Sequence, residues 1–231
     1  IAFGLHAYFF FALPLFAFLG AVGVSFLVYG ISLIGGHFSM HTLLLAGVAI
    51  SAFLNAIISA VIILIPSNEA LREILFWLAG GLDSRTWVHV WMSGPLILAG
   101  VIIIVVFARD LNLLMLGDDD ARSMGIRVGT IRPLLIAAAS LVTGVAVAVS
   151  GIIAFVGLVV PHMLRILVGP DHRVLIPVSA FGGALFLVLA DTIARTILEP
   201  AELRVGIISA FVGAPFFIIL LIRNRRRIEP L

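Results

Sequence analysis

Seven apolar stretches constrain this chain more than any other feature of its sequence, because they carry almost no charge. They cover roughly residues 8–34, 42–65, 88–107, 132–149, 152–168, 174–198 and 205–222. A helix needs about 20 apolar residues to cross a bilayer core of about 30 Å. We therefore expect an all-α, polytopic membrane bundle with seven transmembrane helices. Apolar runs of this length exclude an outer-membrane barrel, whose strands would alternate in polarity over about ten residues.

Composition supports the membrane assignment and narrows the chemistry. The sequence is 62% hydrophobic and 11% charged, whereas a soluble domain is about 45–50% apolar and about 25% charged. Soluble enzymes and nucleic-acid modules are therefore not expected. The chain has no Cys, which excludes disulfides and thiolate chemistry. It also has no Lys and so cannot form a Walker A loop, which means that any ATP must bind to another chain.

The distribution of arginines between the spans predicts the orientation. The links 109–132 and 169–173 and the C-terminal tail alternate to one side of the membrane and together hold nine Arg. The opposite side receives four, namely Arg72, Arg85, Arg195 and Arg204. Because positive residues accumulate on the cytoplasmic side, we expect the C-terminus to lie in the cytoplasm.

Two short sequence patterns occur twice, and their order predicts an internal repeat. Residues 13–21 align with 176–184, and residues 50–53 align with 208–211. The partners lie five spans apart and so cross the membrane in opposite directions, as in the inverted-topology repeats of many transporters. A complete pair of five-helix units needs ten spans. We therefore expect about three further helices before residue 1, in agreement with a chain that begins with Ile rather than Met.

The link between the third and fourth spans predicts two short helices. Gly117 can end the first, and Asp118–Asp120 can start the second by capping free N–H groups and opposing the helix dipole. A common face would then carry Ala121, Met124 and Val128. Such a face suggests docking to a partner, although an ordinary loop that shields the bundle remains an alternative. Three consecutive acidic residues do not converge on a helix and the six His are scattered, so we expect no metal site.

The segment 150–165 is the most unusual part of the apolar sequence. Gly151 and Gly157 permit close backbone approach, and Pro161 removes a donor and can kink a helix. Irregular backbone at membrane depth is tolerated only against protein or a water-filled cavity. His162 and Arg165 lie one turn apart and could form a gate or a partner contact, but an interfacial cap is the simpler interpretation of His162.

A few polar residues interrupt the spans. Asp191 and Arg195 stand four positions apart, which predicts an intrahelical ion pair, more often structural than functional near a helix end. Asn55 suggests an interhelical hydrogen bond, with a place along a transport pathway as the alternative. An aromatic belt is indicated around the 66–90 link by Trp77, Trp87 and Trp91.

Six sequence blocks carry a resemblance to a known family. They are 77–81, 116–125, 151–162, 169–173, 189–195 and 213–217. In this order they resemble the permease subunits of bacterial ABC importers for ferric siderophores, haem and cobalamin, the type II or FecCD-like importers. The likeness runs through nearly the whole chain.

The resemblance implies an assembly. Such permeases have ten helices, lie in the inner membrane, and work as two permease copies with two ATPase subunits and an extracytoplasmic substrate-binding protein. ATP and Mg would bind to the ATPase, and this chain would hold no cofactor and act as no enzyme itself. The bundle 1–231 would therefore be the C-terminal seven helices of a permease, with a cytoplasmic coupling region at 109–132.

The resemblance also implies roles for individual residues. Coupling to the ATPase would use Gly117, Asp118, Asp119, Ala121, Arg122, Met124 and Gly125. The translocation pathway would be lined around Gly151, Phe155, Gly157, Pro161 and His162, with Asn55 as a further candidate. Acidic residues of the binding protein would meet Arg72, Arg85 and Arg204.

The chain departs from the family pattern in three places. Ile152–Ala154 replaces a Pro-Ile-Gly sequence, Arg204 stands where Pro is common, and Asp118 stands where Glu is usual. A secondary transporter is the alternative reading, but it would need intramembrane carboxylates, and only Asp191 is available. An intramembrane enzyme would need paired catalytic groups, which we do not find. The sequence does not indicate which chelate is carried.

Overall fold

The computed structural model describes residues 12–34, 38–198 and 202–225. Within these ranges the chain forms ten helices and no strand, which confirms the predicted all-α membrane bundle. The chain divides into two compact units. The first comprises Ile1–Leu75, Thr86–Ile104 and Arg127–Val149, and the second comprises Phe76–Arg85, Val105–Ile126 and Ser150–Leu231.

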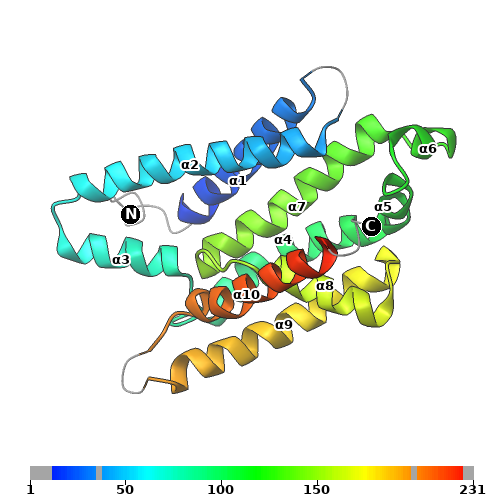
Figure 1. The fold of residues 1–231 in the computed structure, drawn as a ribbon. Coiled ribbons are helices and arrows are strands. Elements are labelled where there is room, and N and C mark those ends of the chain that lie inside the picture. The colour runs from blue at the N-terminus through cyan, green and yellow to red at the C-terminus, as the bar shows by residue number, and fades with distance from the viewer. Residues whose placement is uncertain (1–11, 35–37, 199–201, 226–231) are drawn as a thin grey trace. The chain divides into compact units, whose positions relative to one another are not determined.

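Long apolar helices make up the first unit. They are α1 (Ala12–Ser32), α2 (Met40–Leu64), nearly all of α4 (Trp87–Val106) and nearly all of α7 (Val128–Ser150). α1 packs against α2 (Figure 1). Ser39 starts α2 because its hydroxyl accepts a hydrogen bond from the Thr42 N–H at 3.2 Å. α2 ends at Leu64 because the next residue precedes Pro66, and a residue before proline disfavours the helical conformation.

Short and long helices together make up the second unit. Its helices are α5 (Ala108–Leu114), α6 (Asp118–Ser123), α8 (Val156–Val168), α9 (His172–Thr196) and α10 (Val205–Arg225). α8, α9 and α10 pack against one another, and α5 packs against α9 (Figure 1). Ala190, Ala194 and Val205 form a buried core in this unit. Small residues at these positions allow the helices to approach closely.

In the part of the chain that the structure describes, five helices are long and apolar enough to cross a membrane, namely α1, α2, α4, α7 and α9. The two remaining predicted spans correspond to shorter apolar helices, Val156–Val168 and Val205–Leu220. The span predicted over roughly 152–168 is shorter in the structure, because α8 begins only at Val156. Its 13 residues extend about 20 Å, which is less than a bilayer core.

One helix lies in a segment that we predicted only as a link between spans. α3 (Asn68–Ala79) contributes residues to both units. Its sequence signals are Ser67, whose hydroxyl accepts from the Ala70 N–H at 3.4 Å, an acidic residue in the first turn, and Gly80 after the last turn. α3 is amphipathic and short, so a search for apolar spans does not find it.

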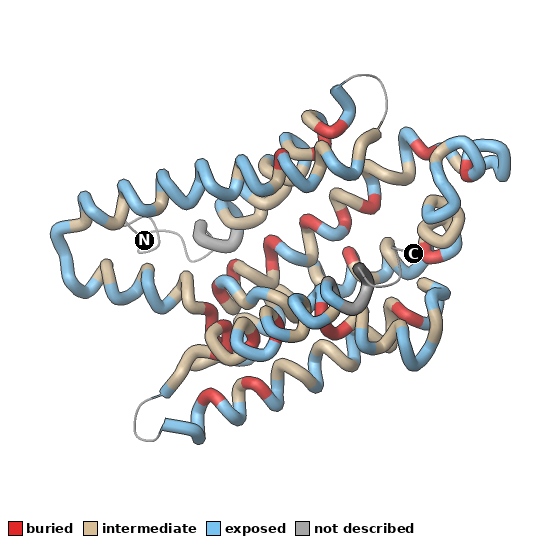
Figure 2. The backbone as a smooth tube through the Cα atoms, in the orientation of Figure 1, coloured by how far each residue is buried: buried red, intermediate tan, exposed pale blue. Residues whose placement is uncertain are grey.

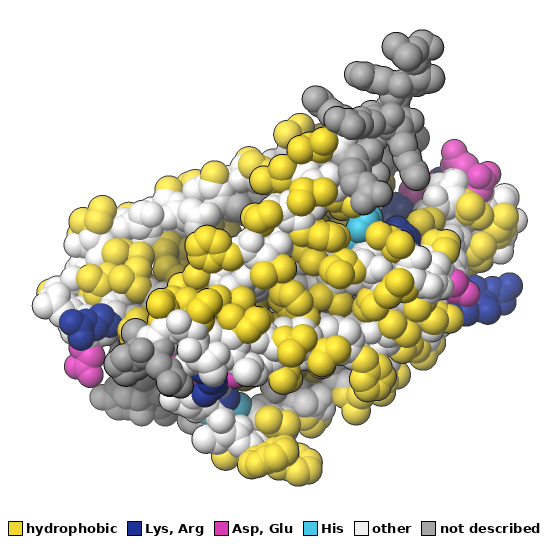
Figure 3. Space-filling model, turned by 60° about the horizontal axis from the view of Figure 1, so that its bottom comes forward, with side chains coloured by type: hydrophobic (Ala, Val, Ile, Leu, Met, Phe, Trp, Pro, Cys, Tyr) yellow, Lys and Arg dark blue, Asp and Glu magenta, His cyan; other side chains and the backbone are white. Residues whose placement is uncertain are grey.

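Exposed apolar side chains are abundant, as a membrane protein requires. Along α2 only Ala46 is buried, whereas buried positions recur along α7 (Figure 2). Hydrophobic side chains are spread over the face seen in Figure 3, and charged groups are few there. Large exposed apolar surfaces mark contact with lipid or with another protein.

Candidate functional site

The helix break between α7 and α8 lies in the segment that we predicted to be irregular. Residues 151–154 have no helical structure, and α8 starts after Phe155, which adopts a left-handed conformation with φ of 68°. That conformation costs a non-glycine residue about 1–2 kcal/mol. Gly213 on α10 leaves room for the Phe155 side chain in this conformation, because a Cβ atom at Gly213 would collide with that side chain. The break is therefore held by tight packing against α10.

Three irregular segments meet at the break through their backbones. The Gly81 N–H donates to the Ser150 carbonyl at 2.8 Å, the Ile152 N–H donates to the Trp77 carbonyl at 3.3 Å, and the Gly206 N–H donates to the Gly80 carbonyl at 3.2 Å. The end of α3, the α7–α8 break and the start of α10 thus satisfy one another's peptide groups. Backbone outside a helix is tolerated at membrane depth only when it is satisfied in this way.

Glycine is required where these segments meet. A Cβ atom on Gly80 would collide with the Ile152 carbonyl oxygen, one on Gly151 with the Trp77 carbonyl oxygen, and one on Gly206 with the Ala79 carbonyl oxygen. Gly80 and Gly151 also have positive φ angles, 64° and 67°. We call Gly80, Gly151 and Gly206 the glycine junction. The predicted close approach at Gly151 is confirmed.

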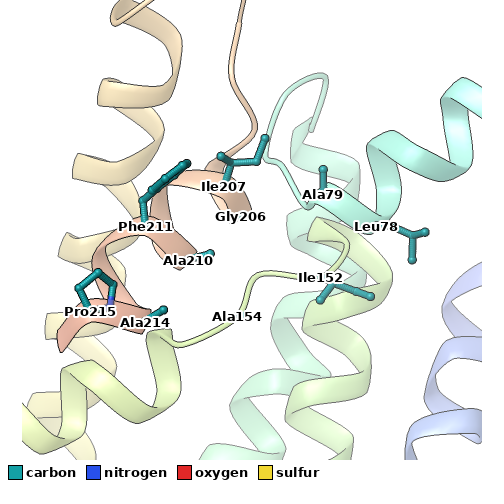
Figure 4. Close-up of a pocket in the computed structure, with 10 residues that line it drawn as sticks. All are labelled: Leu78, Ala79, Ile152, Ala154, Gly206, Ile207, Ala210, Phe211, Ala214 and Pro215. Carbon is teal, nitrogen blue, oxygen red and sulfur yellow. The ribbon is translucent and has the colours of Figure 1, made fainter. Parts of the chain in front are cut away.

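An open apolar cleft of about 600 Å³ lies beside the glycine junction (Figure 4). Its walls come from α3, the α7–α8 break and α10. They are lined by Leu78, Ala79, Ile152, Ala154, Gly206, Ile207, Ala210, Phe211, Ala214 and Pro215. These described lining residues include no charged side chain, so the cleft can accommodate a large solute or an apolar helix without ionic recognition.

None of the predicted pathway residues lines this cleft, although Gly151 and Phe155 are next in sequence to the lining residues Ile152 and Ala154. Gly157 has nothing within 4 Å of where a Cβ atom would stand, so the close approach expected there is not found among the described residues. Pro161 lies inside α8, and the His162 ring packs edge-on against Phe216 of α10, with ring centroids 6.2 Å apart. Asn55 lies exposed on α2 in the first unit, and its carbonyl accepts from the Ser59 hydroxyl at 2.9 Å. Sequence reasoning missed the large contribution of α10 to the cleft.

The predicted pair of short helices is found around Gly117. Gly117 has a φ of 110° and is the N-cap of α6, and Asp118–Asp120 occupy the first turn of that helix. Arg122 interacts with Asp119 at 2.9 Å and with Asp118 at 3.8 Å. The carboxylates therefore favour α6 through the helix dipole and through local pairing.

The expected common face of Ala121, Met124 and Val128 is wrong. Ala121 and Val128 are buried, whereas Met124 is exposed. The reason is that α6 ends at Ser123, so helical spacing does not continue beyond it. Gly125 then turns the chain with a φ of 87°, and the Ile126 N–H donates to the Ala121 carbonyl at 3.0 Å. The exposed apolar side chains of this region are instead Met115, Leu116 and Met124.

The charged residues near the end of α9, before α10 and around α3 are either paired within the chain or exposed. Asp191 and Arg195 form the predicted intrahelical ion pair, with 2.8 Å between the Arg195 Nε and an Asp191 carboxylate oxygen. Arg204 pairs with Asp83, and its guanidinium lies 4.4 Å from the centroid of the Phe76 ring. Only 22% of the Arg204 side chain is exposed, whereas Arg72 and Arg85 are exposed residues. Arg204 is thus engaged within the chain.

Within the described residues, no group of three or more His and acidic side chains could hold a metal ion. The prediction that the six His are scattered is wrong for one pair, because His37 and His41 stand four positions apart, a spacing that metal ligands on a helix can have. His37 lies outside the described residues, and His41 is exposed at the start of α2.

Comparison with known families and proteins gives consistent results. The family model described as the FecCD transport family matches residues 1–223. The cobalamin import system permease protein BtuC of Halobacterium salinarum is 46% identical over 206 residues, which cover 89% of this chain and 54% of that protein. The hemin transport system permease protein HmuU of Yersinia pestis is 40% identical over 211 residues, which cover 91% and 63%.

Two further relatives extend this comparison. The Fe(3+)-citrate import system permease protein YfmD of Bacillus subtilis is 38% identical and is covered over 62% of its length. The chain thus spans 54–63% of the length of these three relatives. A solved structure described as an inward-facing conformation of a metal-chelate type ABC transporter matches with a TM-score of 0.79 at 30% identity, over 92% of this chain and 72% of that one.

Proposed function

Because the chain belongs to the FecCD transport family, we propose that it is the transmembrane permease part of an ATP-binding-cassette importer. The observation that carries this proposal is the open apolar cleft beside the glycine junction. The walls of this cleft carry no charged side chain, and part of them is irregular backbone. A membrane tolerates irregular backbone only beside protein or a water-filled path. A permease needs such a smooth surface, along which a large solute can move without being held.

The substrate class in this proposal is an iron chelate, haem or cobalamin. Support comes from three relatives whose names specify cobalamin, hemin and ferric citrate import. The described cleft residues are apolar and supply no side-chain charge to distinguish these solutes. Selection among them would therefore belong mainly to an extracytoplasmic binding protein.

The proposed assembly contains two permease copies, two ATPase subunits and one binding protein in the bacterial inner membrane. The complete permease would have ten transmembrane helices in an inverted repeat, of which this chain would supply seven. In that arrangement the α7–α8 break lies within the membrane, so that residues 151–168 cross it together. The C-terminus and the link that holds α5 and α6 would be cytoplasmic, because most Arg lie on that side.

Contact with the ATPase is proposed at α6 and the turns that flank it. Met115, Leu116 and Met124 are exposed apolar side chains, and Asp119 beside them is almost wholly exposed. Apolar anchors with a polar rim are typical of protein interfaces. ATP and Mg would bind to the ATPase, since this chain has no Lys for a phosphate loop. In this proposal α6 passes the movement of the ATPase to the permease.

Uptake by a reconstituted system tests the proposal. The full-length protein, its ATPase and its binding protein are placed in liposomes, and the import of cobalamin, hemin and ferric citrate is measured with and without ATP. We expect ATP-dependent import of one of the three, and loss of that import when Asp118–Arg122 is replaced with Gly and Ser. Import driven by an ion gradient without ATP would instead establish the secondary-transporter alternative.

A further inference from the structure

The side-chain amide of Asn112 joins α5 to the start of α9. Its Nδ2 donates to an Asp171 carboxylate oxygen at 2.7 Å. Its Oδ1 accepts from the His172 backbone N–H at 3.0 Å and lies 2.6 Å from the His172 Nδ1. Asp171 is the N-cap of α9 and also accepts from the Arg173 N–H at 3.0 Å. We call Asn112, Asp171 and His172 the amide latch.

The chemistry of the amide latch matches Asn at this position. The Asp171 carboxylate only accepts hydrogen bonds and the His172 N–H only donates, so each must face one particular end of the amide. The His172 Nδ1 then carries its proton and donates to Oδ1. Hydrogen bonds from the Arg173 backbone N–H and the Asn112 amide lower the pKa of Asp171. Such charge-assisted bonds are stronger than neutral ones.

The amide latch joins the helix that precedes the proposed coupling helix α6 to the first residues of α9. α5 contacts both α6 and α9. α9 in turn packs against α10, which forms one wall of the apolar cleft. α5 has only seven residues, too few to be stable as a helix on its own. A second polar contact to this region runs from Arg165 on α8 to the Met115 sulfur at 3.6 Å.

We propose that Asn112 is a positioning residue for transport, which fastens α5 to α9 so that a displacement of α6 reaches the cleft wall through α9 and α10. This inference rests on the proposed function. Its consequence is that breaking the amide latch separates ATP hydrolysis from import. The ratio of ATP hydrolysed to substrate imported is therefore the informative quantity, because a defect in folding alone lowers both activities together.

An exchange of side chains tests the pairing. Asn112→Asp sets two carboxylates against each other, whereas the double variant Asn112→Asp/Asp171→Asn restores a donor opposite an acceptor. The double variant also keeps an oxygen at the α9 N-cap and acceptors for His172. All variants are made in the full-length permease, assembled with the ATPase and binding protein, and assayed with cobalamin, hemin and ferric citrate. Melting temperature and co-purification of the ATPase are measured for each.

The expected result is that Asn112→Asp raises the ATP used per substrate imported by at least about tenfold, the equivalent of one charge-assisted hydrogen bond. The double variant should return to within about threefold of the wild type, given that such pairs are recovered only in part. A wild-type ratio in the single variant, or no recovery in the double variant, would overturn the proposal. If the single variant does not accumulate, Asn112→Ala replaces it, and an unchanged ratio there would be equally decisive.

A second measurement separates this inference from the proposed function. Hydrogen exchange of the amides in residues 108–114 should be faster in Asn112→Asp than in the wild type and slower again in the double variant. This result needs no transport activity. If the wild-type complex showed no ATP-driven import, the proposed function would fail, and hydrogen exchange would still report whether the amide latch exists.

Discussion

At the scale of single residues, the glycine junction predicts a sharp difference between two glycines. In Gly206→Ala the new methyl group would meet the Ala79 carbonyl oxygen, so the backbone must move and the Gly206–Gly80 hydrogen bond is lost. We expect the free energy of unfolding to fall by about 1–3 kcal/mol, as for other overpacked sites. Titration with SDS of the purified protein, followed by circular dichroism, measures this change.

Gly157→Ala is the matched control. Gly157 is exposed, lies in the first turn of α8 and has open space where a Cβ atom would stand. Alanine favours a helix over glycine by about 1 kcal/mol, so this variant should be as stable as the wild type or slightly more stable. Equal destabilisation by both substitutions would show that the glycine junction has no special packing.

The sequence predicts those residue contacts that are local. Asp191 and Arg195 pair as expected, because i,i+4 spacing on a helix brings two side chains together whatever the tertiary structure. The meeting of Gly80, Gly151 and Gly206 depends on three segments far apart in the chain, and no local pattern encodes it. Arg204 shows the same limit, since its partner Asp83 lies 121 positions away.

At the scale of elements, α3 and the turn after it supply the exposed arginines proposed to meet a binding protein. Arg72 and Arg85 are exposed, whereas Arg204 is engaged with Asp83. Arg72→Glu and Arg85→Glu should each weaken binding of the substrate-loaded binding protein up to about fivefold, the range of an exposed ion pair. Fluorescence titration at low and high salt measures this effect, which should shrink as salt screens the charges.

Arg204→Glu serves as the comparison for these two variants. It places a carboxylate beside Asp83 and removes the contact with Phe76, so its main effect should be a lower melting temperature. Arg72→Glu should leave the melting temperature unchanged. Wild-type binding in both the Arg72 and Arg85 variants at low salt would contradict their proposed role.

The elements that the sequence predicts best are long and apolar. α1, α2, α4, α7 and α9 follow directly from hydropathy. The start of α8 does not, since Ile152 and Ile153 are as apolar as the helix that follows, and only packing against α3 and α10 keeps their backbone irregular. α6 likewise begins where its acidic residues predict, but its early end at Ser123 turns Met124 away from the expected face.

At the scale of the whole molecule, the proposed orientation can be tested because the sequence contains no Cys. Single cysteines at exposed positions would report their side of the membrane through a membrane-impermeant maleimide. Glu69→Cys on α3 should react in intact cells. Ser123→Cys on α6 and Arg173→Cys on α9 should react only in inverted vesicles, at least about tenfold faster than in cells.

The unsubstituted full-length protein gives the background for this labelling. The reverse pattern would place the C-terminus outside and would contradict the proposed position of α6 beside the ATPase. Reaction of Ser123→Cys and Arg173→Cys on opposite sides would contradict the number of crossings between them. The arginine distribution predicts orientation but cannot report such crossings, because the link that holds Arg173 is short and carries one positive charge.

The glycine junction is made of peptide groups alone, and this sets its response to the surroundings. Its hydrogen bonds join backbone N–H groups to carbonyl oxygens, and none of these groups titrates or carries a net charge. Dissolved ions weaken the attraction between charges such as Arg204 and Asp83, but they screen hydrogen bonds between uncharged peptide groups far less. High salt concentration or low pH should therefore leave the hydrogen bonds of the glycine junction intact.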